Sequence, residues 1–200
     1  MKLPSAYKHI PGWFSDAEAA QLYKLVRKTT GRRILEAGTY CGRSTACICE
    51  AIRDSGSREF FSYDLACDSD QEYQQFARTL GHTGYLHMPA ELHALWAKGT
   101  NSHLQAQAYL REAGLLDYVT LVKGDFRTDP SFYDILFLDT VHGPEEARAN
   151  LPHAIRLAKK GAWVAIHDMY SHTLALIEAE YGKQLKFQTL TDTLGLFTRL

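Results

Sequence analysis

The segment Ile34–Thr45 constrains the fold more than any other part of the chain. An apolar run ends at Glu36, a turn with Gly38 and Gly42 follows, and a helix-forming segment begins at once. This order predicts a strand, a tight loop and a helix. In a parallel sheet such a loop lies at the carboxyl end of its strand, where open α/β sheets bind ligands. We therefore expect a ligand site at this loop.

The carboxylate of Glu36 indicates which kind of ligand to expect. Dinucleotide-binding loops bring backbone N–H groups and a helix N-terminus to a pyrophosphate. A carboxylate at the strand tip would repel phosphate and favour a cation or a hydrogen-bond donor. S-adenosylmethionine carries an ammonium and a sulfonium and has no phosphate, so it fits this polarity. A branched side chain at Gly38 is expected to block its approach.

Further apolar runs end at acidic residues, and helical patterns separate them. The acids are Asp64, Asp125, Asp139 and, after His167, Asp168. Alternating strands and helices predict a doubly wound, Rossmann-like α/β fold with helices on both faces of a parallel sheet. Right-handed crossovers bring these strand ends to one edge. A hairpin around Thr191–Thr193 completes seven expected strands, of which the last is antiparallel.

Local signals predict where several helices begin and end. Ser15–Glu18 reads as a capping box. Ser102 and Ser171 are expected to open helices, and Pro144 occupies a favoured first helical position. Gly161 is expected to end the helix that Pro144 begins.

Composition favours a single domain over residues 1–200, with an N-terminal helical segment in residues 1–30. The formal net charge is −1 and no basic face stands out, so nucleic acid is not expected as a partner. The chain shows neither a signal-peptide core nor an apolar stretch that could span a membrane, which predicts a cytoplasmic protein. A small-molecule acceptor is the expected partner, and a homodimer is left open.

The stretch 66–100 is too long for a simple strand-to-helix connection. Its aromatic and related side chains are Tyr73, Phe76, Tyr85, Met88 and Trp96, interleaved with His82, His87 and His93. Two interpretations remain open: a small helical subdomain covering the sheet edge, or a lid that shapes an acceptor pocket. As a lid, its rings are expected to face the exit of the methyl group rather than the adenine pocket.

With these residues in view, the chain resembles the class I S-adenosylmethionine-dependent methyltransferases. It looks most like small-molecule O-methyltransferases of the macrocin type and, more distantly, the catechol type. The resemblance rests on Leu35–Thr45, Phe137–His142 and Lys160–Met169. It implies transfer of a methyl group from S-adenosylmethionine to a hydroxyl of a small molecule, such as a natural product.

The resemblance also implies roles for residues at the strand ends. Glu36 and Gly38 would border the methionine part of the cofactor, and Asp64 would bind the ribose hydroxyls. Asp125 would accept from the adenine amine while Phe126 packs on the base. The other residues implied to bind the cofactor are Thr39, Tyr40, Gly42, Ser44 and Asp139.

Asp139 and Asp168 match positions where relatives bind a divalent cation, and two carboxylates suit magnesium. His167 is a third candidate ligand, although the macrocin type has another acid there; imidazole would favour manganese or iron. His142 is the candidate general base beside Asp139, because its ordinary pKa suits proton removal from a hydroxyl. The alternative is that the acids only organise a metal-free site.

A nicotinamide dehydrogenase lacks support because the first loop has no G-x-G-x-x-G, and a serine hydrolase because G-x-S-x-G is absent. A non-catalytic binding subunit stays open, as does a metal-independent N- or C-methyltransferase or cyclase with the same cofactor. The acceptor's identity does not follow from the sequence.

Overall fold

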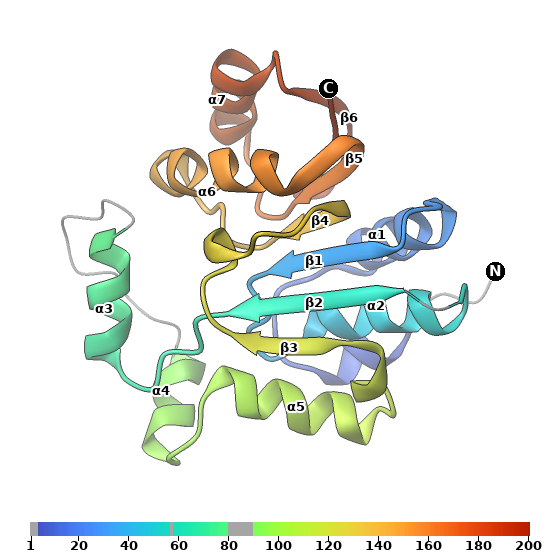
Figure 1. Ribbon diagram of the computed structural model, residues 1–200. Coiled ribbons are helices and arrows are strands. Elements are labelled where there is room, and N and C mark those ends of the chain that lie inside the picture. Colours follow the sequence, from blue (N-terminus) through green and yellow to red (C-terminus); the bar gives the residue numbers. More distant parts are fainter. Residues whose placement is uncertain (1–3, 57, 80–89) are drawn as a thin grey trace.

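The computed structural model describes residues 4–56, 58–79 and 90–200, and their strands form one seven-stranded sheet of order β3-β2-β1-β4-β5-β7-β6 (Figure 1). The strands are β1 Arg33–Ala37, β2 Glu59–Asp64, β3 Thr120–Lys123, β4 Tyr133–Leu138, β5 Ala158–Ile166, β6 Leu185–Thr191 and β7 Leu194–Arg199. Strands β1 to β5 pair in parallel, and β7 runs antiparallel to both β5 and β6. The predicted Rossmann-like sheet with an antiparallel last strand is confirmed.

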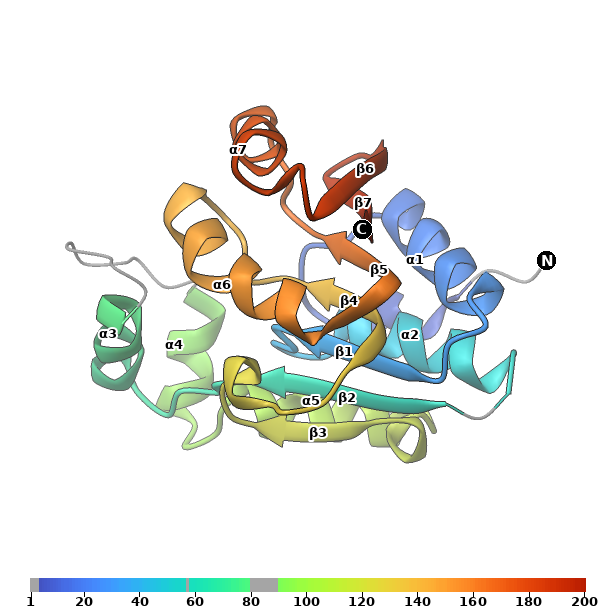
Figure 2. The same cartoon turned by 45° about the horizontal axis from the view of Figure 1, so that its top comes forward.

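Helices cover both faces of the sheet (Figure 2). They are α1 Asp16–Lys28, α2 Arg43–Arg53, α3 Asp70–Thr79, α4 Ala90–Ala97, α5 Ser102–Glu112, α6 Pro144–Leu157 and α7 Ser171–Tyr181. Buried side chains of α1, α2 and α5 share one apolar cluster, and those of α6 and α7 share another on the opposite face. The strands between them are therefore buried on both sides, which explains why their sequences read as continuous apolar runs.

The first helix and the last hairpin form as the sequence predicts. The Ser15 hydroxyl accepts from the Glu18 backbone N–H at 3.1 Å, and the Glu18 carboxylate accepts from the Ser15 N–H at 2.8 Å. This is the reciprocal capping box. In the hairpin, Asp192 adopts a left-handed backbone conformation (φ +50°), which lets β6 turn directly into β7.

Helices α5 and α7 begin at Ser102 and Ser171 as expected, whereas the predicted end of α6 at Gly161 is wrong. Asn101 rather than Ser102 caps α5, through its side-chain oxygen and the Leu104 N–H, and Tyr170 precedes Ser171 at the start of α7. Helix α6 ends at Leu157, so Gly161 does not terminate it. Gly161 instead lies within β5, where the pairing with β4 shifts register. Its φ of +79° suits glycine in an irregular strand.

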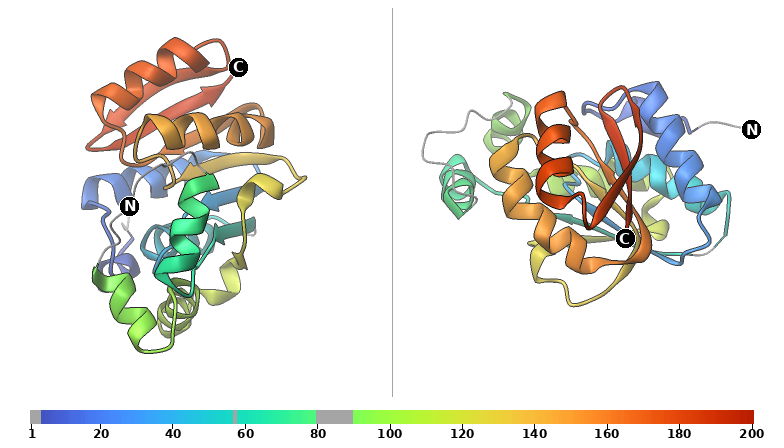
Figure 3. Two further views of the ribbon diagram at one scale, coloured as in Figure 1. Left: turned by 90° about the vertical axis from the view of Figure 1, so that its left-hand side faces the viewer. Right: turned by 90° about the horizontal axis from the view of Figure 1, so that it is seen from above.

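The segment after β2 contributes α3 and α4, which lie beyond the carboxyl ends of the parallel strands (Figures 1 and 3). Within the segment, the Trp96 indole N–H donates to the Cys67 carbonyl at 2.6 Å, and Lys123 at the end of β3 ties it to the body through Asp68 at 2.6 Å. Residues 80–89, with Tyr85, Met88, His82 and His87, lie outside the described residues. Within the described part of the chain, no helix is long and apolar enough to cross a membrane.

Candidate active site

The Glu36 side chain is fully buried beneath the loop that follows β1. Its carboxylate accepts hydrogen bonds from the hydroxyls of Ser44 (2.6 Å), Thr45 (2.6 Å) and Ser62 (2.5 Å). Burial raises the pKa of Glu36 to about 7, although these hydroxyls favour the charged form. Glu36 does not line the cavity above the loop. It ties the start of α2 to β1 and β2 and thereby fixes the loop, while its contact with a cofactor stays a prediction.

The loop glycines serve the packing of the strand ends. Gly38 has φ +94°, and a side-chain Cβ there would lie 2.4 Å from the Asp139 carbonyl oxygen. A branched residue would therefore push β1 and β4 apart at their carboxyl ends, which differs from the expected obstruction of a ligand. Gly42, with φ +90°, is the residue before α2 and does not line the cavity. Both positions favour glycine for its freedom at positive φ.

A cavity of about 400 Å³ opens at the carboxyl ends of β1 to β5. Of the predicted site residues, those that line it are Gly38, Thr39, Tyr40, Ser44, Asp64, Asp125, Phe126, Asp139, His142, His167 and Asp168. Asp64 accepts from the backbone N–H groups of Tyr40 (2.6 Å) and Ala66 (2.7 Å), which place its carboxylate at the cavity wall. Burial raises its pKa. The fold thus gathers nearly all predicted residues around one space.

Asp125 has an ion-pair partner within its own turn. Arg127 contacts both carboxylate oxygens, at 2.7–3.0 Å. Burial disfavours the charged form, but the Arg127 hydrogen bonds outweigh it and lower the pKa of Asp125. The Arg127 guanidinium lies 5.5 Å from the ring centre of Phe76 in α3. Phe76 thus packs on Arg127, the ion-pair partner of Asp125, while the expectation that the rings of this segment face the exit of the methyl group rather than the adenine pocket stays a prediction.

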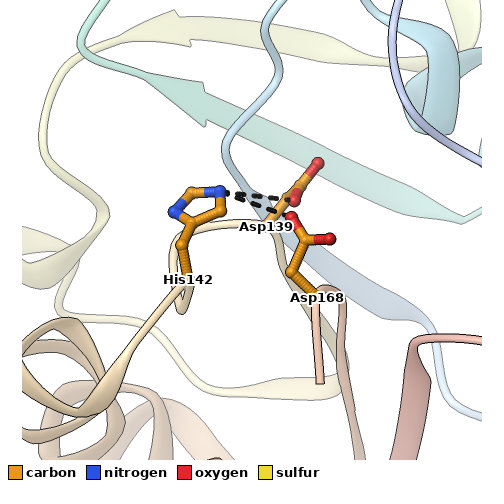
Figure 4. Close-up of side chains that lie close together, drawn as sticks. All are labelled: Asp139, His142 and Asp168. Atoms are coloured by element: carbon orange, nitrogen blue, oxygen red, sulfur yellow. Dashed lines mark ion pairs between the residues drawn. The ribbon is translucent and has the colours of Figure 1, made fainter. Parts of the chain in front are cut away.

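Asp139, His142 and Asp168 converge at the other end of the cavity (Figure 4). Their candidate ligand atoms all lie within 4.8 Å of one another. His142 Nε2 is 3.9 Å from Asp139 Oδ1 and 3.7 Å from Asp168 Oδ2. Asp168 has a left-handed backbone (φ +55°), a conformation that is uncommon outside glycine. Two carboxylates and an imidazole are suitable ligands for a divalent cation.

Glu146, near the start of α6, orients His142. Its carboxylate accepts from the His142 backbone N–H and contacts Nδ1, both at 2.8 Å. These contacts leave Nε2 facing the two aspartates. The Glu146 hydrogen bond raises the pKa of His142 to about 9, with further contributions from Asp139 and Asp168. A carboxylate behind the far ring nitrogen is the usual partner of a metal-binding or proton-transferring histidine.

His167, the third predicted metal ligand, lines the cavity and contacts Asp139. Its ring is buried, with Nδ1 3.0 Å from Asp139 Oδ1 and Nε2 3.4 Å from Glu18 Oε2. Burial opposes its charge, but the hydrogen bonds to Asp139 and Glu18 prevail and raise its pKa to about 10. Both ring nitrogens thus face carboxylates. His167 supports Asp139 from behind, while His142 completes the group of three; metal binding by His167 stays a prediction.

The residues before α1 form the cavity wall beside the group of Asp139, His142 and Asp168. Arg43 donates to the carbonyls of Ile10 (2.8 Å) and Phe14 (3.2 Å) and so holds the segment against α2. Phe14 packs edge-on against the His167 ring at 5.4 Å. Trp13 is 64% exposed and stacks on Tyr40 at the cavity. An N-terminal element therefore contributes directly to the site.

Sequence reasoning missed several of these residues. Glu146 carries a detectable signal, since it follows His142 by one helical turn at a helix start. The sequence indicates only a capping role for Glu18, and its second contact, with His167, has no local signal because 149 positions separate the two. Thr140 was also missed. Its hydroxyl is buried without a partner among the described residues, and the residue lines the cavity.

Two features of the cavity lining bear on whether S-adenosylmethionine fits there. A buried unpartnered hydroxyl is costly unless something binds it, so Thr140 points to a polar ligand in the cavity. The Asp64 carboxylate, which lines the cavity at the end of β2, suits the hydroxyl groups of the cofactor better than a phosphate. The residues present therefore fit this cofactor.

Comparison with solved structures places the fold among methyltransferases. The cofactor-bound protein Rv0187 from MTB has a TM-score of 0.63 at 19% identity, covering 97% of this chain and 86% of that one. A SAM-dependent O-methyltransferase from Thermotoga maritima gives 0.62 at 15% identity (98% and 71%). The O-methyltransferase TomG from Streptomyces achromogenes, involved in tomaymycin synthesis and solved with SAM, gives 0.53 at 18% identity (93% and 79%). At these identities the likeness concerns the fold.

A family model provides the sequence evidence. Residues 35–169, which include the loop after β1 and the ends of β2 to β5, match the family described as "Methyltransferase domain". Among curated proteins no significant match was found. The match spans more than half of the chain and contains Asp64, Asp139 and Asp168. The chain therefore belongs to the methyltransferase domain family and is an S-adenosylmethionine-dependent methyltransferase.

Proposed function

We propose that this enzyme methylates a hydroxyl group of a small molecule with the help of a divalent cation. The observation that carries the proposal is the convergence of Asp139, His142 and Asp168 within 4.8 Å at one end of the cavity. S-adenosylmethionine supplies an electrophilic methyl group, and a hydroxyl becomes a good acceptor only when it loses its proton. A site for oxygen methylation therefore needs groups that hold the oxygen and take the proton.

Asp139 and Asp168 are the residues that would hold the cation, most simply magnesium. A bound divalent ion makes a coordinated hydroxyl more acidic and fixes its direction. Burial and the neighbouring Asp139 raise the pKa of Asp168, so an added positive charge stabilises its ionised form. His167 and Glu18 keep Asp139 in place from behind.

His142 is the proposed base, and Glu146 is its positioning residue. Without a cation, the surrounding carboxylates hold the His142 pKa near 9, so the imidazole carries its proton at neutral pH. A cation that neutralises Asp139 and Asp168 removes part of this effect and favours the neutral ring. Nε2 would then accept the proton of the acceptor hydroxyl. The competing hypothesis is that His142 Nε2 binds the cation as a third ligand and does not act as the base.

The acceptor is expected to be a small molecule rather than nucleic acid. The chain is nearly neutral, with a formal charge of −1, and the cavity of about 400 Å³ is in the size range of small-molecule sites. The O-methyltransferases among the structures of similar fold support this proposal. The helices α3 and α4 are proposed as a cover over the cavity, with Phe76 on the cofactor side.

The test is transfer of labelled methyl groups to a panel of hydroxylated small molecules, with magnesium or with excess chelator. Turnover should fall sharply in chelator and in Asp168→Asn, while S-adenosylhomocysteine affinity stays close to wild type. Asp117→Asn, an exposed aspartate outside the cavity, is the matched control. Full activity in chelator would contradict the metal-assisted reaction and favour a metal-free site that the acids only organise.

A further inference from the structure

A second cavity lies at the opposite end of the parallel strands from the active site. Its volume is about 640 Å³, and it is bounded by α1, the turn before β1, the start of β5 and the hairpin of β6 and β7. Small-molecule sites typically span roughly 300–1,000 Å³. The methyltransferase reaction makes no use of this groove.

The irregular start of β5 creates the groove. Tyr133 pairs with Ala158, but the next pair is Ile135 with Trp163, so β5 contains extra residues relative to β4. These residues bulge away from the sheet, and Lys159, Lys160 and Gly161 are exposed. The strand resumes at Trp163, whose partly exposed side chain lines the groove. Bulges of this kind often redirect side chains at binding sites.

The rim of the groove is positively charged. Lys24, Lys28 and Lys160 line it, and none of them forms an ion pair among the residues the structure describes. Asp134, the acidic residue in the lining, is already engaged by the Lys159 ammonium at 2.8 Å and by the Arg32 and Arg33 backbone N–H groups. The three free ammonium groups therefore produce an excess of positive potential.

The floor of the groove is apolar. Leu25, Ala162 and Leu196 are buried side chains of the lining, and Trp163 adds an aromatic surface. A ligand that matches both parts has a flat apolar body and an anionic group. A ligand with only the apolar body would leave the lysines without a partner, and a ligand with only the anionic group would leave the apolar floor uncovered.

We propose that this groove is a second binding site for a small aromatic anion, carrying a carboxylate, sulfonate or phosphate. The apolar body covers Trp163 and the leucine floor, and the anionic group lies among Lys24, Lys28 and Lys160. The site is independent of the cofactor cavity, which lies beyond the other ends of the strands.

Calorimetry of the full chain with naphthalene-2-carboxylate tests the proposal, with tryptophan fluorescence as a second readout. The carboxylate should bind, more weakly at higher salt. Naphthalene-2-carboxamide, which keeps the ring without the charge, and inorganic phosphate, which lacks the ring, should each bind at least about tenfold more weakly. Trp163→Phe should remove the fluorescence response, and S-adenosylhomocysteine should not displace the probe.

Two charge variants make the test specific. The groove variant Lys24→Gln/Lys28→Gln/Lys160→Gln should lose about tenfold or more in affinity for the carboxylate. The control Lys98→Gln/Arg111→Gln/Lys183→Gln removes the same charge from exposed positions outside the groove and should bind like wild type. The proposal is overturned if the carboxylate does not bind, if the carboxamide binds equally well, if both variants lose equally, or if S-adenosylhomocysteine competes.

Discussion

Glu36 should make the stability of the protein fall as the pH rises from about 4.5 to about 8. In the unfolded chain a glutamate ionises near pH 4.5, whereas burial raises the folded-state pKa of Glu36 to about 7. The folded state therefore binds the Glu36 proton more tightly. Its contribution is fully present below the unfolded pKa and is lost as the pH passes through the folded pKa. At about 1.4 kcal/mol per pH unit, the loss amounts to about 3 kcal/mol.

Glu36→Gln is the perturbation that isolates this contribution. The amide has the same shape as the protonated acid but no charge to bury, and any cost of rearranging the hydroxyls of Ser44, Thr45 and Ser62 does not depend on pH. Urea unfolding at a series of pH values gives the free energy of unfolding of both proteins. The difference between them should change by about 3 kcal/mol in favour of glutamine across this window.

A second variant checks the direction in which the pKa of Glu36 is shifted. Ser44→Ala removes a hydroxyl that favours the ionised form of Glu36, so the pKa should rise further and the loss of stability should extend to higher pH. Parallel pH profiles for wild type and Glu36→Gln would refute the reasoning, because Glu36 would then titrate alike in the folded and unfolded states.

Three further predictions concern the site. His142→Ala should lower turnover by about 10² to 10⁴ with unchanged Mn²⁺ affinity in calorimetry; loss of Mn²⁺ binding would make His142 a ligand instead of the base. Glu18→Gln should lower the pKa of His167 in an NMR titration and destabilise the fold by about 1–3 kcal/mol in urea, and an unchanged His167 pKa would rule out their coupling. Phe76→Ala should weaken S-adenosylhomocysteine binding, since Phe76 packs on Arg127; unaltered affinity would place α3 away from the cofactor.

The sequence predicts most of the sheet because its signals are local. The capping box at Ser15 and the turn around Asp192 act within a few residues, and the loop after β1 is defined by Gly38 and its neighbours. Gly161 leads to a wrong prediction because a local signal of this kind does not show which element the glycine belongs to. Glycine often follows a helix end, but here the helix stops at Leu157 and glycine allows the irregular start of β5.

The site residues that escaped prediction depend on long-range contacts. Glu18 reaches His167 only because α1 packs beside the end of β5, and no pattern in either segment indicates this pairing. Likewise, the choice between His142 and His167 as partner of the two aspartates depends on side-chain directions. Both histidines lie near an aspartate in sequence and both line the cavity, but only the folded chain shows that His167 is buried against Glu18 while His142 Nε2 faces the two aspartates.

The most direct test of the central claim is a calorimetric titration of the wild-type protein with S-adenosylmethionine, S-adenosylhomocysteine and NAD under identical conditions. We predict that the first two bind at a single site and that NAD does not, because the loop after β1 lacks the G-x-G-x-x-G pattern that brings backbone N–H groups to a pyrophosphate. Asp64→Asn should weaken binding of both sulfur compounds. Binding of NAD, or failure of S-adenosylhomocysteine to bind, would contradict the claim.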